Sequence, residues 1–315
     1  MANDYLWCEK YRPNTISDCV LPERLKDTFQ GFINSGKLPN LLLTGTAGIG
    51  KTTVAHALVD ELGYNKLFIN GSLSGNIDTL RTTISNFATT ISLNGVRKVV
   101  ILDESDYLNP QSTQPALRSF MEQYSKNCGF ILTANFKNKI IEPLQSRCSG
   151  IEFNINKAEK AELAKQFYTR VRGILEAEGV EYDNKVVINL ITKHFSDWRR
   201  VLNELQRYAS NNNKIDVGVL VDVDTGIDEL FELTKHLKSK DFSRMRKWVA
   251  QHPDYDPVSL FTNLFHNASS FVKPESIPQL VLHLSEYQYK SAFVSDQEIN
   301  TVACLTEMMT DCEFV

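Results

Sequence analysis

A glycine-rich run that ends in a lysine and two threonines has the clearest chemistry in this sequence. Residues 45–53 read GTAGIGKTT and fit the phosphate-binding pattern G-x-x-x-x-G-K-[ST], known as Walker A or the P-loop. In such a loop backbone N–H groups face the phosphates, the lysine reaches the β- and γ-phosphates, and the next hydroxyl ligates magnesium. We therefore expect a nucleoside triphosphate to contact Gly45, Gly48, Ile49, Gly50, Lys51, Thr52 and Thr53, with Thr52 also holding Mg²⁺.

Two carboxylates follow an apolar run further along the chain. Residues 99–102 read VVIL and precede Asp103 and Glu104. Phosphates bind at the carboxyl ends of parallel strands, so we expect Asp103 to hold magnesium and Glu104 to orient and deprotonate the attacking water. Together with Lys51 and Thr52, this glutamate favours an ATPase over a P-loop kinase, which needs no such base.

A third apolar run ends in an amide. Residues 131–134 read ILTA and precede Asn135. Its side chain could hydrogen-bond the γ-phosphate or the lytic water. Equally, an asparagine after a strand caps a turn. The strand pattern by itself leaves both alternatives open.

The elements that must position these groups alternate in type. A buried strand is expected at residues 41–43, directly before the P-loop, and an amphipathic helix directly after it. Further strands are expected at 67–70, 98–102 and 129–134, separated by helices at 78–92 and 113–124. This alternation predicts crossover connections and an α/β domain whose parallel sheet is covered by helices on both faces.

Helical periodicity replaces the strand pattern from Lys157 onward. A short element is expected at 215–223, after a polar run, and helices dominate again from Ile227 to the end. A chain of 315 residues exceeds one typical core. We therefore expect a P-loop domain at 1–155, a small helical domain at 156–225 and an all-α domain at 226–315.

Composition sets limits on function. The chain is 42% hydrophobic and 23% charged, and no apolar run approaches the length of a membrane span. Without a secretory pattern at the start, a cytoplasmic protein with no membrane contact is expected. The six cysteines are scattered and are expected to be reduced. Residues 226–315 contain 8 Lys and Arg against 13 Asp and Glu, a balance of −5, which argues against nucleic-acid contact there.

Six motifs occur in the order found in AAA+ clamp-loader ATPase subunits. They are W-x-x-K-Y-R-P at 7–13, the P-loop, Asp-Glu at 103–104, Thr-Ala-Asn at 133–135, Ser-Arg-Cys at 146–148 and Asp-Trp-Arg-Arg at 197–200. Over roughly residues 5–210 the chain thus resembles this family, most of all the small ATPase subunit of T-even-type phage clamp loaders. Small subunits of replication factor C come next.

The resemblance implies further residue roles. Arg147 would be an arginine finger that acts in trans on ATP bound to a neighbouring subunit; without the family match it is an ordinary surface arginine. Catalysis would then depend on Glu104, Asn135 and Arg147. Arg199 would bind the γ-phosphate from the second domain, which in this family is a lid. The adenine pocket would be lined by Tyr11, Arg12 and Pro13.

The family also contacts DNA, around the helix that contains residues 77–83. Arg81 and Thr82 would touch DNA phosphates there, where a helix N-terminus, an arginine and hydroxyls suit sequence-independent contact. Basic density near this helix is thin, and Arg81 as a solvent-facing helix residue is the alternative. Gln114 and Arg118 lie four residues apart on one helix face. They either carry a signal between sites or support the helix surface.

The function implied by the resemblance is a clamp-loader ATPase. With ATP and Mg²⁺ it would open a DNA polymerase clamp and load it onto primer-template DNA, in the cytoplasm of a phage-infected bacterial cell. Its partners would be the sliding clamp, DNA and copies of itself in a ring or spiral, namely a homotetramer plus one different subunit. The third domain would be the collar that joins them. The alternatives are another AAA+ DNA motor or remodelling ATPase, or a scaffold that binds ATP without hydrolysing it.

Overall fold

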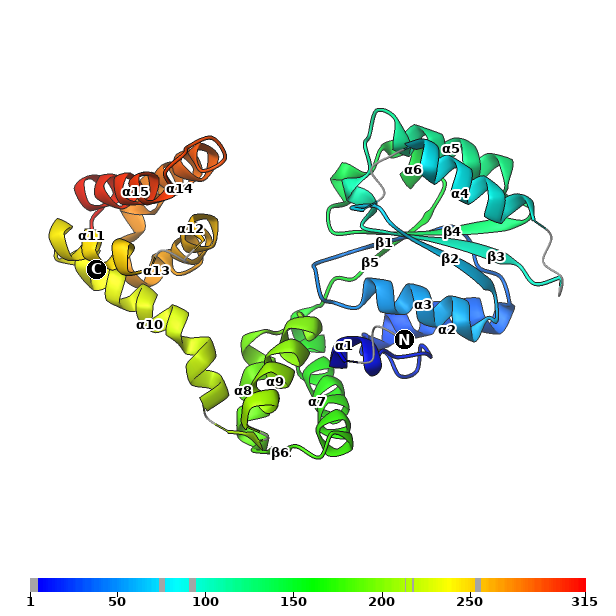
Figure 1. Cartoon of the computed structure of the whole chain (residues 1–315), viewed down its shortest axis with the longest axis horizontal. Coiled ribbons are helices and arrows are strands. Elements are labelled where there is room, and N and C mark those ends of the chain that lie inside the picture. The colour runs from blue at the N-terminus through cyan, green and yellow to red at the C-terminus, as the bar shows by residue number, and fades with distance from the viewer. Residues whose placement is uncertain (1–4, 74–76, 91–94, 213, 217, 253–255) are drawn as a thin grey trace. The chain divides into compact units, whose positions relative to one another are not determined.

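The chain divides into two compact units, Met1–Leu220 and Val221–Val315, drawn in Figure 1. The structure, a computed structural model, describes residues 5–73, 77–90, 95–212, 214–216, 218–252 and 256–315; for 77–79 and 220–229 it describes the backbone alone. The finer boundaries at residues 155 and 225 stay predictions. No helix in the described ranges has the length and apolarity needed to cross a membrane.

A five-stranded parallel sheet lies at the centre of the first unit, which confirms the predicted sheet. Its strand order is β2-β3-β4-β1-β5, and each neighbouring pair is parallel. Strands β1, β3 and β4 are buried along nearly their whole length, as expected of apolar runs covered on both faces. The strands are β1 (Leu41–Thr44), β2 (Asn65–Asn70), β3 (Lys98–Asp103), β4 (Cys128–Ala134) and β5 (Ser149–Glu152).

Helices cover both faces of this sheet (Figure 1). One face packs against α2 (Glu23–Ser35) and α3 (Lys51–Glu61) around Phe29, Leu43 and Leu58. The other face packs against α4, α5 and α6. These helices are α4 (Ile77–Thr89), α5 (Thr113–Gln123) and α6 (Glu142–Gln145), with the short 3-10 helices η1 (Ser105–Tyr107) and η2 (Lys137–Lys139) in the loops after β3 and β4.

A helical segment completes the first unit. It contains η3 (Lys157–Glu159), α7 (Lys160–Ala177), α8 (Asn184–Lys193) and α9 (Trp198–Asn212), with a two-stranded parallel pair of β6 (Glu181–Tyr182) and β7 (Lys214–Ile215). The N-terminal helix α1 (Trp7–Lys10) packs on it, because the Trp7 N–H donates to Gln206 Oε1 at 2.9 Å. The short element expected at 215–223 is not separate, since helix α10 (Gly218–Lys238) runs through most of that range.

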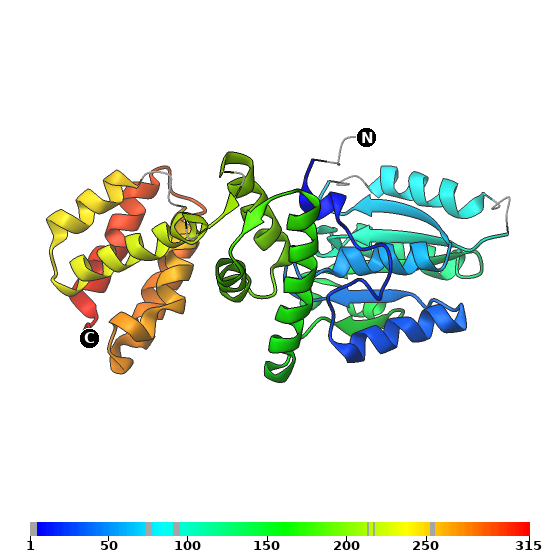
Figure 2. The ribbon, with the colours of Figure 1, turned by 90° about the horizontal axis from the view of Figure 1, so that it is seen from below.

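The regular elements that the structure describes in the second unit are all helices, as predicted (Figure 2). Aspartates begin three of its helices: Asp241, Asp256 and Asp296 each accept a backbone N–H of the first turn. Phe261, Leu264, Ala268 and Phe271 belong to its core, while Phe265 is half exposed. After α10 the elements are α11 (Phe242–Gln251), α12 (Pro257–His266), α13 (Ala268–Phe271), η4 (Pro274–Ser276), α14 (Ile277–Lys290) and α15 (Gln297–Asp311).

A buried lysine closes the C-terminal end of α4. Lys98, at the start of β3, donates from Nζ to the Phe87 carbonyl at 2.7 Å, to Thr90 Oγ1 at 2.6 Å and to the Thr90 carbonyl. The last carbonyls of a helix have no partner within it and carry the negative end of its dipole. The Lys98 ammonium gives these carbonyls a hydrogen-bond donor and places a positive charge at the negative end of the dipole. It thereby links α4 to the sheet.

We expect Lys98→Met to lower the free energy of unfolding by about 1–3 kcal/mol, because it leaves buried carbonyls unsatisfied. Lys66→Met is the matched control: its Nζ pairs with Asp60 at 2.6 Å on the surface, and loss of such a pair costs under ~1 kcal/mol. Urea unfolding of both variants, with hydrogen exchange of α4, provides the measurement. Equal losses in the two variants would contradict this role of Lys98.

Candidate functional site

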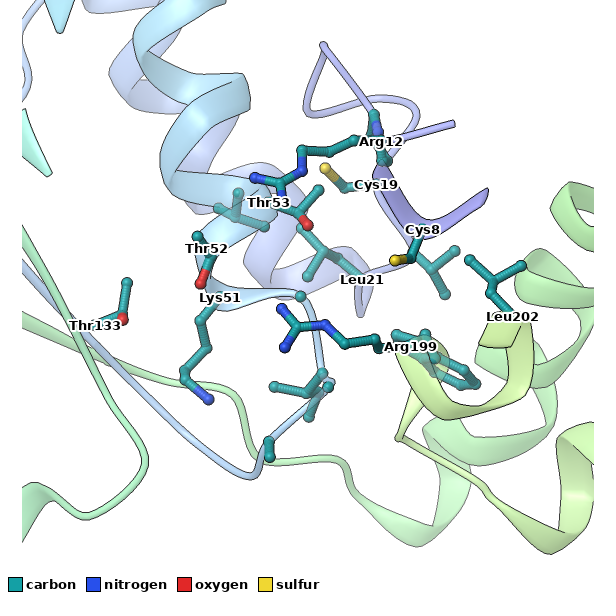
Figure 3. Close-up of a pocket in the computed structure, with 18 of the residues that line it drawn as sticks. Cys8, Arg12, Cys19, Leu21, Lys51, Thr52, Thr53, Thr133, Arg199 and Leu202 are labelled. Carbon is teal, nitrogen blue, oxygen red and sulfur yellow. The ribbon is translucent and has the colours of Figure 1, made fainter. Parts of the chain in front are cut away.

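A pocket opens between the P-loop, the carboxyl ends of β3 and β4, the N-terminal segment and helices α7 and α9 (Figure 3). It brings together residues that are nearly 200 positions apart in the chain. Most of the residues expected to bind the nucleotide or its metal line it: Tyr11, Arg12, Pro13, Gly48, Ile49, Gly50, Lys51, Thr52, Thr53, Asp103, Glu104, Asn135 and Arg199. Gly45 lies at the start of the P-loop, outside this lining.

The P-loop turns directly from β1 into α3. Gly50 is the N-cap of α3 with φ of 102°, a left-handed conformation that a glycine adopts without strain. Because α3 begins at Lys51, the unpaired N–H groups of its first turn face the pocket, together with the positive end of the helix dipole. This local structure suits the binding of an anion.

Lys51 is buried, and its ammonium group is held by neutral acceptors. Its Nζ donates to the carbonyls of Gly45 and Thr46 and to Asn135 Oδ1, each at 2.8 Å. Burial lowers the pKa of Lys51 to about 8, although the nearby Asp103 and other acidic groups act in the opposite direction. An anion beside Nζ would favour the charged form, which suits a phosphate site.

Asn135 faces the P-loop rather than capping its own turn. Its Oδ1 accepts from Lys51, whereas the turn after β4 is held by Asp106, whose Oδ2 accepts the N–H groups of Asn135 at 3.2 Å and Phe136 at 3.3 Å. The structure thus places the Asn135 side chain beside the P-loop lysine, and its contact with a phosphate or the lytic water stays a prediction. Sequence reasoning missed Asp106, because a turn-capping carboxylate three residues after Asp103 carries no motif.

Two hydroxyls converge on Asp103. Its Oδ1 accepts from Thr52 Oγ1 and from Thr133 Oγ1, both at 2.6 Å. Mg²⁺ prefers oxygen ligands and is typically held by one or two carboxylates plus substrate phosphates. The carboxylate and the P-loop hydroxyl therefore fit a magnesium ion beside the triphosphate.

Glu104 has an unusual backbone. Its φ is 52°, in the left-handed region, where a bulky residue is strained. The Glu104 N–H donates to Thr133 Oγ1 at 3.1 Å, which holds the strained residue in place. Within the described part of the chain the structure records no hydrogen bond to the Glu104 carboxylate, which lines the pocket. Strain of this kind persists only where the surroundings enforce it.

The N-terminal segment is joined to the helical segment beside the pocket. The Tyr11 hydroxyl donates to Glu178 Oε1 at 2.7 Å, and the Lys10 ammonium contacts the same oxygen at 2.7 Å. Arg170 of α7 donates to the carbonyls of Tyr11 and Asp18. Burial lowers the pKa of Arg170. Sequence reasoning missed this arginine, which lies at an ordinary amphipathic position of α7, and the apolar lining residues Val20 and Leu21, which lie in a loop that carries no motif.

Arg199 reaches the pocket from the first turn of α9. Figure 3 shows its guanidinium extending toward the P-loop residues Lys51 and Thr52. The neighbouring Arg200 is exposed and lies outside the pocket lining. The structure therefore separates the two arginines that follow Trp198, because Arg199 lines the pocket and Arg200 does not.

Arg147 lies outside the pocket, just after α6. Its Nε donates to Glu122 Oε1 of α5 at 2.8 Å, and its Nη1 donates to the Pro143 carbonyl at 2.8 Å. The hydrogen bond from Arg147 lowers the pKa of Glu122. Arg118 approaches the same carboxylate, with 3.6 Å between its Nε and Oε1. Arg147 thus lies on a surface patch of charges, away from the pocket of its own chain.

Gln114 and Arg118 differ sharply although they share a helix face. Gln114 is buried: it donates to the carbonyls of Leu108 and Lys139 and accepts the Ile141 N–H, which links the loops after β3 and β4. Arg118 is a surface residue. Arg81 and Thr82 are exposed on α4 and do not line the pocket, and the residues at 74–76 before this helix lie outside the described ranges.

Comparison with known proteins matches two family descriptions to this chain. The description "ATPase family associated with various cellular activities (AAA)" matches residues 41–157, and "Sliding-clamp-loader large subunit, AAA+ ATPase lid domain" matches residues 159–221. The sliding-clamp-loader large subunit of Enterobacteria phage T4 is 35% identical over 97% of this chain and 96% of its own length. The same subunit of Escherichia phage RB69 is 37% identical over 78% of this chain and 77% of its own.

Cellular relatives and solved structures agree with this match. The replication factor C small subunit of Methanosphaera stadtmanae is 30% identical over 96% of this chain and 97% of its own. The phage relatives are named large subunits, so the designation small does not apply to them. The Holliday junction branch migration motor RuvB of Thermotoga maritima has a TM-score of 0.53 at 18% identity, over 73% of this chain and 80% of that chain. This last likeness concerns the fold.

Proposed function

The chain belongs to the sliding-clamp-loader subunits of the AAA family of ATPases, and from this premise we propose that it uses ATP binding and hydrolysis to open a DNA polymerase clamp and load it onto primer-template DNA. The observation that carries the proposal is the convergence of Lys51, Asn135, Asp103 and Glu104 in one pocket at the edge of the sheet. This set can bind a triphosphate and also activate water.

ATP would lie with its phosphates at the N-terminus of α3. Lys51 would exchange its carbonyl partners for β- and γ-phosphate oxygens, and Arg199 would approach the γ-phosphate from α9. Adenine would lie beside the N-terminal segment, where the pocket is lined by Tyr11, Arg12 and Pro13. Because Arg199 belongs to the helical lid, ATP would hold the lid on the P-loop domain.

Thr52 and Asp103 would hold the magnesium ion. When bound, Mg²⁺ would offset the negative charge of the phosphate oxygens. The proposal rests on these two residues alone, because the described ranges contain no group of three or more His, Cys, Asp or Glu side chains suited to a metal. A hydroxyl, a carboxylate and phosphate oxygens form an ordinary Mg²⁺ environment.

Hydrolysis would proceed by attack of water on the γ-phosphorus. Glu104 would take the proton as the water oxygen bonds to phosphorus, while the bond to the β–γ bridging oxygen breaks and ADP leaves. Asn135 would orient the water or the γ-phosphate. Arg147 would stabilise the transition-state charge on ATP bound to a neighbouring subunit, which agrees with its place outside its own pocket.

Assembly would use copies of this chain. We propose a homotetramer plus one different clamp-loader subunit in a ring or spiral, joined by the helical second unit as a collar. Exposed aromatic side chains such as Phe231, Tyr289 and Phe293 on that unit are available for such contacts. Arg81 and Thr82 would touch DNA phosphates from α4. The site of action would be the cytoplasm of the infected host, in line with the phage relatives.

The proposal predicts that clamp and primer-template DNA together stimulate ATP hydrolysis by the assembled loader more than the sum of their separate effects. The reason is that both ligands would be needed to bring neighbouring subunits together, so that Arg147 of one subunit reaches the ATP of the next. The measurement is phosphate release with clamp, DNA, both or neither, and loader made with Lys51→Met sets the background.

Other outcomes identify the alternative functions. Processive unwinding or translocation that does not depend on the clamp would indicate a DNA motor. Tight ATP binding with no turnover under any of the four conditions would indicate a scaffold subunit. Either result would contradict the clamp-loading proposal.

A further inference from the structure

The helical segment that matches the lid-domain description, residues 159–221, contacts the P-loop at Gly48. A Cβ placed on this residue would lie 1.9 Å from Asp197 Oδ1 and 3.1 Å from Asp197 Cα, so Asp197 fills the space that a side chain at Gly48 would need. The Trp198 N–H donates to the Gly48 carbonyl at 3.2 Å. Gly48 itself has φ of 74°. The start of α9 therefore rests directly on the loop that would hold the phosphates.

Asp197 also caps α9. Its Oδ1 accepts the Arg200 N–H at 3.0 Å, the third residue of the helix, as expected of an N-cap carboxylate. The backbone carbonyl of Asp197 accepts the Val201 N–H at 3.3 Å. The same carboxylate oxygen thus fixes the first turn of α9 and lies against Gly48. Arg199 is in that first turn and lines the pocket.

The chain before Asp197 is strained, and the residue after it is anchored. Ser196 has φ of 77°, a left-handed conformation that costs free energy for a residue with a side chain. Trp198 is 7% exposed, and its ring lies 4.4 Å from that of Phe167 and 5.3 Å from that of Phe195, measured between centroids. Three sets of contacts, at Gly48, in the helix cap and around Trp198, enforce one conformation at this junction.

Asp197 has no role so far in the proposed chemistry, yet it is the side chain that joins the P-loop to the helix with Arg199. We propose that Asp197 is a positioning residue for recognition of the γ-phosphate: it couples the conformation of the P-loop at Gly48 to the place of Arg199. Loss of the side-chain oxygen that caps the helix frees the first turn of α9, and the Arg199 guanidinium then meets the γ-phosphate less often. The inference rests on the proposed role of Arg199 in ATP binding.

The test compares affinities of the full chain for ATPγS and for ADP, since ADP lacks the phosphate that Arg199 would bind. Arg199→Ala is expected to weaken ATPγS binding ~10- to 100-fold and ADP binding much less, the range for one charge-assisted hydrogen bond. Asp197→Ala is expected to weaken ATPγS binding ~5- to 50-fold, again with little change for ADP. Asp197→Asn is expected to keep most of the unchanged chain's ratio of ATPγS affinity to ADP affinity, because the amide oxygen still caps the helix.

Asp183→Ala is the matched control. Asp183 is also an aspartate N-cap of a lid helix, since its side chain accepts the Lys185 N–H at 2.8 Å, but it is exposed and lies outside the pocket lining. Its loss is expected to lower the melting temperature and leave the ratio of ATPγS to ADP affinity unchanged. If Asp197 had only a structural role, Asp197→Ala would likewise lower the melting temperature and leave the ratio of ATPγS to ADP affinity unchanged.

A thermodynamic cycle completes the experiment. If Asp197 acts through Arg199, the double variant Asp197→Ala/Arg199→Ala binds ATPγS no more weakly than Arg199→Ala alone. Additive losses, equal losses for both nucleotides, failure of the Asn variant, or no effect of Arg199→Ala on the ratio would each overturn the inference. Failure of clamp loading would appear only in the assembled loader and would leave these binding ratios intact, so the two proposals fail separately.

Discussion

Glu104→Gln is expected to reduce ATP turnover by the assembled loader by ~10²- to 10⁴-fold, the usual contribution of a general base, while ATP binding stays intact. Glutamine keeps the shape and hydrogen-bonding reach of the side chain but cannot take a proton. The strained backbone at φ of 52° and the bond from its N–H to Thr133 do not depend on the carboxylate, so the loop keeps its conformation. Only the chemical step is lost.

The measurement pairs ATPγS affinity with phosphate release under saturating clamp and primer-template DNA. Glu152→Gln is the control: Glu152 ends β5 at the same edge of the sheet, pairs with Lys137 at 2.7 Å and lies outside the pocket lining. Its turnover is expected to match that of the unchanged chain. Undiminished hydrolysis by Glu104→Gln would remove Glu104 from the role of base.

Arg147→Ala is expected to reduce assembly-dependent hydrolysis by ~10³- to 10⁵-fold, the range for a lost arginine finger. In the structure Arg147 is held by Glu122 on the surface, and both side chains are substantially exposed. Solvent screens such an exposed pair, so it offers little resistance when a neighbour's ATP competes for the guanidinium. Release from Glu122 would therefore accompany assembly.

Mixing two inactive variants tests whether the finger acts on a neighbour. Chains with Arg147→Ala keep a complete nucleotide pocket, and chains with Lys51→Met keep the finger. Mixed assemblies would contain interfaces in which one chain supplies the pocket and the other supplies Arg147, so hydrolysis should return in part. Arg172→Ala, which removes an exposed arginine paired with Glu176 on α7, is the control and should change nothing. No recovery on mixing would indicate that Arg147 acts within its own chain.

Several features of the site could be predicted from short patterns. The P-loop carries its own backbone requirements, because glycines permit the left-handed turns and the following helix presents its free N–H groups. The apolar runs that end in Asp103-Glu104 and Asn135 indicated two strands with polar groups at their carboxyl ends. Since β3 and β4 are parallel neighbours, those groups had to meet at one edge of the sheet.

Other features depend on partners that are distant in the sequence. Asn135 could cap a turn or face the phosphates, and only the packing of β4 beside β1 brought it within 2.8 Å of Lys51. In the sequence Lys98 is an ordinary charged residue at the start of a strand. Only in the folded unit do the last carbonyls of α4 lie beside its ammonium group. The contact of Asp197 with Gly48 joins residues about 150 positions apart, and no local pattern records it.

The sequence by itself therefore determined the P-loop turn, the parallel sheet and the family, because each depends on residues within one loop, one strand-to-turn junction or one ordered set of motifs. Only the tertiary structure decided which polar groups pair: Asn135 with Lys51, Arg147 with Glu122, and Asp197 with the P-loop. The physical reason is range. Backbone preferences and hydrophobic periodicity act over a few residues, whereas a hydrogen bond in the site needs two atoms within about 3 Å, which the folding of the whole unit alone can arrange.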